Sequence, residues 1–281
     1  MLGIVGESGS GKSTLLKAVA QIRGLSTEIH AGTVTLNGQD ISALSERARR
    51  SLRGEEIAMV FQYAGASLNP SRTIGTQLKE TMRAHADFSD PEIRQRAAEV
   101  FSGMGFPDTD RILTAYPFEL SGGMAQRAAI ALAVILRPQL LLADEPTSAL
   151  DATIQLQVLD ELRALKERTG TAILLITHNI GVVRHIADRV AVMSEGRIVE
   201  QGSVREVLEH PQHDYTKSLL AAVPKMYVRD ASETDCDPCH MHAAHPSSIH
   251  IHAHKGVDAA SDLLRFENVS MHFKDGAAHI Q

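Results

Sequence analysis

Only two of the 281 residues are cysteines, Cys236 and Cys239. Two neighbouring cysteines cannot cross-link a chain of this length, so its stability must come from packing, as in proteins of a reducing compartment. Long hydrophobic runs are also missing, because the longest, residues 128–136, falls far short of the ~20 residues that a membrane-spanning helix needs. Residues 1–5 lack the basic start of a signal peptide. These absences exclude a disulfide-built protein and a chain that crosses a membrane by itself, and they predict a cytoplasmic protein.

An excess of positive charge is missing as well. Lysine and arginine number 28 against 34 aspartates and glutamates, which gives a net charge of −6. This balance disfavours general binding to a nucleic-acid backbone, so we expect no nucleic-acid partner. What the chain does have is 43% hydrophobic residues, enough for the core of one large α/β domain or two modest ones.

The order of apolar patterns predicts an α/β fold. A short apolar run at Leu2–Val5 is followed by a glycine-rich loop and by helical spacing over residues 12–22. The β-branched stretch 33–36 ends in the turn dipeptide Asn37-Gly38, which predicts a small antiparallel ribbon. Helical patterns prevail over residues 65–137. Further strands are predicted at residues 57–61, 140–143, 172–176, 189–193 and 197–200, with a helix stripe at 154–165.

Residues 6–13, with the sequence GESGSGKS, lie between the first predicted strand and the first helix, as a phosphate-binding loop does. Glycines let successive backbone N–H groups wrap a phosphate, a lysine neutralises the β- and γ-phosphate oxygens, and a serine hydroxyl binds Mg²⁺. The alternative is a glycine-rich turn beside a helix cap. The candidate nucleotide-binding residues are Gly6, Glu7, Ser8, Gly9, Ser10, Gly11, Lys12, Ser13 and Thr14.

A second motif, LLLADE, ends in Asp144 and Glu145 at the carboxyl end of a predicted buried strand, where parallel sheets present their ligands. Asp144 would hold Mg²⁺, and Glu145 could act as the general base for the water that attacks the γ-phosphorus. The alternative is an acidic strand end that caps the next helix.

A third motif, LSGGMAQR, places Ser121 as the cap of a helix whose first residues, Gly122 and Gly123, expose N–H donors at its positive end. Taken alone, it is only a helix cap. With the other two motifs on either side at this spacing, the sequence resembles an ATP-binding cassette (ABC) ATPase.

The resemblance implies a P-loop NTPase core with a mainly parallel sheet, a small antiparallel β subdomain and an inserted helical subdomain. It assigns Gln62 to the contact with Mg²⁺ and the attacking water, Asp151 to a loop that crosses a dimer interface, and His178 to the γ-phosphate contact. ATP and Mg²⁺ are the implied cofactors. The implied catalytic residues are Glu145, His178 and Gln62, and the implied metal ligands are Ser13, Gln62 and Asp144.

In this family two cassettes face head to tail, so the resemblance also implies a second ABC ATPase domain as partner. Each nucleotide would lie between the phosphate loop of one cassette and Ser121, Gly122 and Gly123 of the other. A monomer should then be almost inactive, because half of the electrostatic stabilisation is missing.

Shorter stretches at 67–70, 116–117, 151–155 and 211–224 resemble the ATPase subunits of oligopeptide, dipeptide and nickel importers. This implies an ATPase at the cytoplasmic face of the membrane that powers peptide or related solute import, together with permease subunits and, indirectly, a solute-binding protein. Two alternatives stay open. One is a soluble subunit of a non-transport complex, as in phosphonate metabolism, and the other is a nucleotide-binding module that truncation has inactivated.

The expected domains are a cassette at residues 1–224, with its helical subdomain at about 65–137, a His-rich linker or tail at 225–262, and a strand-like segment at 263–281. The N-terminal strands that usually precede the phosphate loop are missing, and the last segment resembles them, with Phe273 as the aromatic that stacks on adenine. A tandem fusion, with the second cassette just beginning, is the favoured explanation. A rearranged chain in which Phe273 folds back onto adenine and an incidental tail are the others.

The segment from Cys236 to His254 carries two cysteines and several histidines, which could bind Zn²⁺ or Ni²⁺. A second Cys-x₂-Cys pair is missing from the sequence. A polar linker is therefore the favoured interpretation, and we carry no iron–sulfur centre over from peptide-importer relatives.

Overall fold

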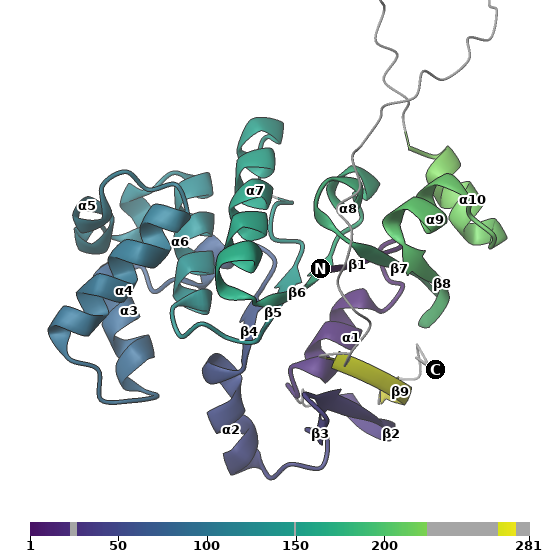
Figure 1. The fold of residues 1–281 in the computed structure, drawn as a ribbon, viewed down its shortest axis with the longest axis horizontal. Coiled ribbons are helices and arrows are strands. Elements are labelled where there is room, and N and C mark those ends of the chain that lie inside the picture. The colour runs from purple at the N-terminus through teal and green to yellow at the C-terminus, as the bar shows by residue number, and fades with distance from the viewer. Residues whose placement is uncertain (23–26, 149, 224–263, 274–281) are drawn as a thin grey trace, which may run out of the picture.

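The computed structural model describes residues 1–22, 27–148, 150–223 and 264–273 (Figure 1). Its larger sheet has the strand order β4-β5-β6-β1-β7-β8. Strands β4, β5, β6, β1 and β7 run parallel, and β8 closes the edge antiparallel to β7. The bounds are β1 Leu2–Val5, β4 Ile57–Val60, β5 Leu140–Asp144, β6 Ala172–Ile176, β7 Arg189–Ser194 and β8 Arg197–Ser203. The predicted α/β class and the mainly parallel sheet are confirmed.

Strand β5 has five residues, all of them buried, because helices cover both faces of the sheet. Leu140 and Leu142 pack into the apolar cluster that contains Leu16 of helix α1 (Lys12–Val19). Leu141 and Ala143 point to the other cluster, which includes residues of helices α6 (Gly122–Val134) and α7 (Ala152–Thr169). Successive side chains of β5 therefore point to opposite faces of the sheet, so the sheet lies between two layers of helices.

A helical region is inserted between β4 and β5 and gathers on the left of Figure 1. Capping side chains start its main helices, because Thr73, Ser89, Asp108 and Ser121 each accept a hydrogen bond from a backbone N–H in the first turn. The predicted helical insertion is thereby confirmed. Its elements are η1 Ala64–Ser67, α3 Ile74–Arg83, α4 Asp90–Gly103, α5 Thr109–Thr114, η2 Pro117–Glu119 and α6.

The smaller sheet has the order β3-β2-β9. Strands β2 (Thr27–Leu36) and β3 (Gln39–Asp40) form the predicted ribbon, with φ of 48° at Asn37 and 78° at Gly38, as a tight hairpin turn requires. Strand β9 (Leu264–Phe273) lies antiparallel along β2, from the Thr27–Phe273 pair to the Leu36–Leu264 pair. The sequence predicted strand character for this segment but not its pairing with β2.

The remaining helices are α2 (Glu46–Glu55), α8 (Ile180–Ile186), α9 (Val204–Glu209) and α10 (Asp214–Ala221). Within the described part of the chain, no helix is both long enough and apolar enough to span a membrane. The predicted linker at 225–262, including the cysteine- and histidine-bearing segment, lies outside the described residues, as does the side chain of Phe273.

Candidate functional site

The predicted phosphate loop joins β1 to α1 (Figure 1). Gly9 and Gly11 have φ of 84° and 96°, a left-handed conformation that favours glycine. A Cβ at Gly6 would lie 2.1 Å from the carbonyl oxygen of Met193, so only glycine fits where the loop leaves the sheet. Gly11 caps α1, which leaves the first N–H groups of that helix facing the loop.

The ammonium group of Lys12 lies inside the loop, with the residue only 6% exposed. Its Nζ donates to the carbonyl oxygens of Gly6 at 2.9 Å and Glu7 at 2.6 Å and to Oγ of Ser10 at 3.3 Å. Desolvation by burial lowers the pKa of Lys12, although Glu145, Asp144 and Glu7 oppose this shift. A buried cation surrounded by backbone dipoles is suited to holding a phosphate.

Asp144 ends β5 beside the phosphate loop. Oγ of Ser13 donates to Oδ1 of Asp144 over 3.1 Å. Burial raises the pKa of Asp144, the charge of Glu145 adds to the rise, and the hydrogen bond from Ser13 opposes it. Burial destabilises the ionised form of this carboxylate, and a bound cation would stabilise it, so the position suits a cation site.

Glu145 contacts two other predicted residues. Its Oε1 lies 2.8 Å from Nδ1 of His178, which follows β6, and its Oε2 accepts a hydrogen bond from Nε2 of Gln62, which follows β4, over 3.3 Å. The backbone of Glu145 has φ of 46°, and its N–H donates to the carbonyl oxygen of Ile176 over 2.9 Å. This left-handed turn is uncommon for a glutamate, and such strain often marks functional sites.

Ser121, Gly122, Gly123 and Asp151 lie at the N-termini of α6 and α7. Ser121 caps α6 through a hydrogen bond from the N–H of Met124, and Asp151 caps α7 through bonds from Thr153 and Ile154. Within the part of the chain that the structure describes, no hydrogen bond joins these caps to the phosphate loop. The site of a single chain therefore contains the first two motifs, together with Gln62 and His178, but not the third motif.

Sequence reasoning did not single out Gln126, which lies in the third motif and is 5% exposed. Its Oε1 accepts from the N–H of Gly65 over 3.2 Å, and its Nε2 donates to the carbonyl oxygen of Pro146 over 2.7 Å. It thereby links α6 to the segment that follows Gln62 and to the residue that follows Glu145. The available signal was an amide within a largely apolar helix, since a buried amide needs partners.

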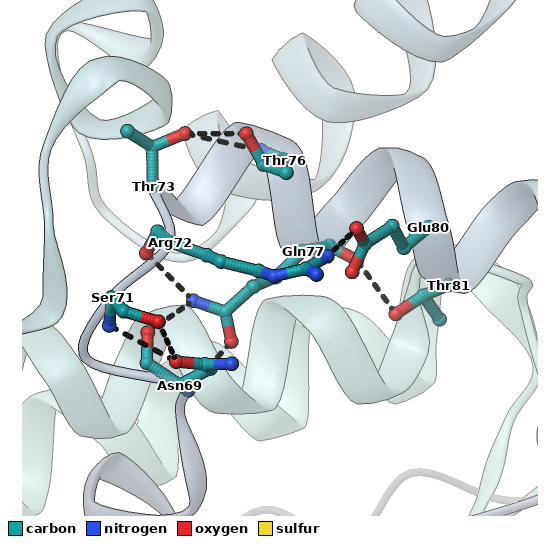
Figure 2. Close-up of polar contacts among 8 residues, drawn as sticks. All are labelled: Asn69, Ser71, Arg72, Thr73, Thr76, Gln77, Glu80 and Thr81. Carbon is teal, nitrogen blue, oxygen red and sulfur yellow. Dashed lines mark hydrogen bonds and ion pairs between the residues drawn. The ribbon is translucent and has the colours of Figure 1, made fainter.

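The loop between η1 and α3 is fixed to α3 by Gln77, as Figure 2 shows. Nε2 of Gln77 donates to the carbonyl oxygens of Asn69 and Arg72 over 3.1 and 3.0 Å, and its Oε1 accepts from the N–H of Asn69 over 2.8 Å. Asn69 in turn accepts two hydrogen bonds from Ser71. Side-chain hydrogen bonds thus anchor the loop to α3 although most of its residues are exposed.

Known proteins with similar sequences and structures are consistent with this architecture. A model of a family described as ABC transporter matches residues 1–148. A protein of Brucella melitensis biotype 1 named as a peptide import ATP-binding protein is 47% identical over 241 residues, covering 83% of this chain and 70% of the relative. The dipeptide transport ATP-binding protein DppD of Escherichia coli K12 is 43% identical over 225 residues, covering 80% of this chain and 69% of the relative.

Two further relatives differ in length or in sequence. The peptidoglycan transport ATP-binding protein YejF of Agrobacterium fabrum is 46% identical, and this chain spans 41% of its length. A solved dimeric post-hydrolysis structure of the ATP-binding cassette MJ0796 bound to ADP and Pi is 29% identical, with a TM-score of 0.64, covering 73% of this chain and 85% of that one. The fold and the site thus define an ATP-binding cassette, and the chain belongs to the ABC transporter family.

Proposed function

We propose that the chain binds ATP with Mg²⁺, hydrolyses it, and uses the energy to power the import of peptides or related small solutes. The observation that carries this proposal is the convergence of Lys12, the Ser13–Asp144 pair and the Glu145–His178 pair from loops after β1, β5 and β6. This arrangement offers a cation for phosphates, oxygen ligands for a metal and a carboxylate for water.

The residues present fit Mg²⁺, because it prefers oxygen ligands and the Ser13 hydroxyl and Asp144 carboxylate already lie together. The amide of Gln62 is the third predicted ligand. When bound, Mg²⁺ neutralises charge on the phosphate oxygens.

Hydrolysis would use Glu145 as general base. Its carboxylate accepts a proton from water as the water oxygen bonds to the γ-phosphorus, and the bond from that phosphorus to the bridging oxygen breaks, leaving ADP and inorganic phosphate. His178 and Gln62 hold one carboxylate oxygen each, so they fix the orientation of the base. The ammonium group of Lys12 stabilises the phosphate oxygens.

A second cassette would supply Ser121, Gly122, Gly123 and Asp151 to this site. Two features support this assignment. These caps make no hydrogen bond to the phosphate loop within the described chain, and the related cassette MJ0796 was solved as a dimer bound to ADP and Pi. The partner would complete the site, as head-to-tail association requires.

A permease would bind beside the helical region at the cytoplasmic face of the membrane. Exposed aromatic side chains support this proposal: Phe61 is 44% exposed, Tyr63 57% and Phe118 72%, and the Tyr116 and Phe118 rings stack with centroids 5.4 Å apart. The backbone of Ile74, which follows the anchored loop of Figure 2, is bonded to that of Ala115, beside the aromatic pair. Exposed aromatic groups are typical of protein interfaces.

For the domains, we propose a cassette at 1–224 with its helical subdomain at about 65–137. The tandem-fusion interpretation of residues 225–281 stays a prediction, which the DNA flanking this reading frame would test.

Transport measurements test the proposed function. Proteoliposomes that hold the permease of the source organism, the chain and the solute-binding protein should take up labelled dipeptides or oligopeptides when ATP is present, and the Glu145→Gln variant should abolish uptake. ATP hydrolysis by the chain without any permease partner, and without peptide uptake, would instead favour the soluble-complex alternative. ATP binding without hydrolysis by an assembled dimer would favour the inactive nucleotide-binding module.

A further inference from the structure

Helix α10 reaches the phosphate loop from the far end of the described cassette. The hydroxyl oxygen of Tyr215 accepts a hydrogen bond from the backbone N–H of Glu7 over 3.0 Å. These residues are 208 positions apart in the chain. The sequence motifs gave Glu7 a place in the phosphate loop but gave Tyr215 no role.

The peptide groups of Glu7 are held on both sides. The carbonyl oxygen of Glu7 accepts from Nζ of Lys12 over 2.6 Å and from the N–H of Ser10 over 3.2 Å. The N–H of Glu7 donates to Tyr215. Hydrogen bonds on both its N–H and its carbonyl limit how far Glu7 can rotate, so Tyr215 helps to set the direction of the carbonyl that receives Lys12.

The side chain of Tyr215 is itself fixed. Its ring packs against an apolar cluster that includes Val5, the residue before the loop, as well as Val192 and Val207. The start of α10 is tied to β8, because the carboxylate of Glu200 accepts from the N–H of Gln212 over 2.8 Å and from the N–H of His213 over 3.1 Å. The Tyr215 hydroxyl is therefore held in place by the packing of its ring and by the hydrogen bonds that fix the start of α10.

We propose that Tyr215 is a positioning residue for the nucleotide site, which orients the first turn of the phosphate loop through the N–H of Glu7. This inference rests on the proposed role of that loop in binding ATP. Tyr215 does not touch the nucleotide; it acts through Glu7 and Lys12. Removing the Tyr215 hydroxyl takes one hydrogen bond from the phosphate loop and leaves the packing of the ring unchanged.

The Tyr215→Phe variant tests the proposal, because it removes only the hydroxyl. A single hydrogen bond of this kind corresponds to about a three- to tenfold change in an equilibrium constant. We expect the Kd for fluorescent ATP and the KM for ATP to rise by that factor, with kcat nearly unchanged. Lys217→Ala, an exposed change on the same helix, is the matched control and should leave both constants unchanged.

Two further measurements separate this proposal from a general loss of structure. Amide hydrogen exchange at Glu7 should speed up in Tyr215→Phe, whether or not nucleotide is present. Glu200→Ala should raise the Kd through the same route, so the double variant with Tyr215→Phe should show less than the product of the single effects.

Clear outcomes would overturn the proposal. If Tyr215→Phe binds ATP like the unsubstituted chain and its Glu7 amide exchanges at the same rate, Tyr215 has no positioning role. If Lys12→Ala binds ATP as well as the unsubstituted chain, the phosphate-loop assignment itself fails. If Lys12→Ala binds ATP normally but the Glu7 amide exchanges faster in Tyr215→Phe, the Tyr215 contact is still established. A failure of the phosphate-loop assignment can therefore be told apart from a failure of the Tyr215 proposal.

Discussion

Oε1 of Glu145 lies 2.8 Å from Nδ1 of His178, and the second carboxylate oxygen of Glu145 accepts from the amide of Gln62. Both partners come from neighbouring strand ends, after β6 and after β4. The carboxylate is therefore oriented from two sides, which is the preorganisation that proton transfer benefits from.

The first prediction concerns Glu145→Gln. The amide keeps the size of the side chain but cannot accept the proton from water, so hydrolysis should fall by about 10²–10⁴-fold. ATP binding should persist, and the two cassettes should stay closed around it. Turnover of radiolabelled ATP and size-exclusion chromatography measure the two effects, with exposed Glu167→Gln as control. Normal turnover in the variant would remove Glu145 from the role of base.

The second prediction tests whether the helix caps act in the partner cassette. A Cβ at Gly122 would meet no atom within 4 Å, whereas one at Gly123 would lie 2.8 Å from Ile154. Gly122→Asp should therefore fold normally but place a negative charge where the partner's phosphates bind. Lys12→Ala and Gly122→Asp homodimers should both be inactive.

Mixing those two variants should restore part of the ATPase activity, because the mixed dimer holds one site with an intact phosphate loop and an intact cap. Steady-state ATPase assays across mixing ratios measure this recovery. As control, a chain that carries both substitutions should give no recovery when mixed with either single variant. If mixing the single variants restores nothing, the caps do not act in trans.

The third prediction follows from the pKa of Asp144. Burial raises this pKa above the unfolded value, so the folded state binds the proton more tightly than the unfolded state does. The resulting stabilisation is fully present below the unfolded pKa and is lost as the pH rises through the folded pKa. At neutral pH the ionised carboxylate therefore destabilises the nucleotide-free protein.

Asp144→Asn should accordingly raise the Tm of the nucleotide-free protein at pH 7 by a few degrees while it abolishes hydrolysis. The gain should shrink at acid pH, where Asp144 of the unsubstituted chain is protonated. Thermal unfolding without Mg²⁺ or nucleotide measures it, and the same change at exposed Asp87 serves as control. An equal or lower Tm at pH 7 would contradict the prediction.

The fourth prediction concerns the buried ion pair between α6 and α7. Nη1 of Arg127 lies 3.3 Å from Oε1 of Glu161, and both side chains are 10% exposed. Arg127→Met leaves Glu161 buried without its partner, which should lower the free energy of unfolding by about 3–5 kcal/mol.

The double change Arg127→Met with Glu161→Leu should be much milder, because no buried charge remains. Arg205→Met, which breaks the exposed Arg205–Glu209 pair, should cost less than about 1 kcal/mol. Urea unfolding curves compare the three proteins. A double variant as unstable as Arg127→Met would show that the loss lies in packing rather than in charge.

Local sequence patterns were sufficient to predict the elements that carry the proposed nucleotide site. The apolar run before Asp144 and the glycines before Lys12 each encode their own turn or strand, and the parallel sheet then brings the strand ends together. Contacts between distant elements were not predictable in this way. The Tyr215–Glu7 and Gln126–Pro146 hydrogen bonds depend on how helices pack against the rest of the fold, and local sequence patterns do not predict that packing.

The small sheet illustrates the same limit. Residues 264–273 have a recognisable strand pattern, but their pairing with β2 joins segments that lie far apart in the chain. Likewise, the pKa shift of Asp144 comes from burial, which the sequence implies only through the apolar run before it.

The pairing of β2 with β9 also has a consequence for biosynthesis. Thr27 and Phe273 are register partners, so that ladder can close only after residue 273 has left the ribosome. Until then, one edge of β2 has unpaired N–H and carbonyl groups that another nascent chain could pair with. Slow translation of the codons for residues 204–273 should therefore prolong an aggregation-prone intermediate, whereas the larger sheet, complete by Ser203, can assemble earlier.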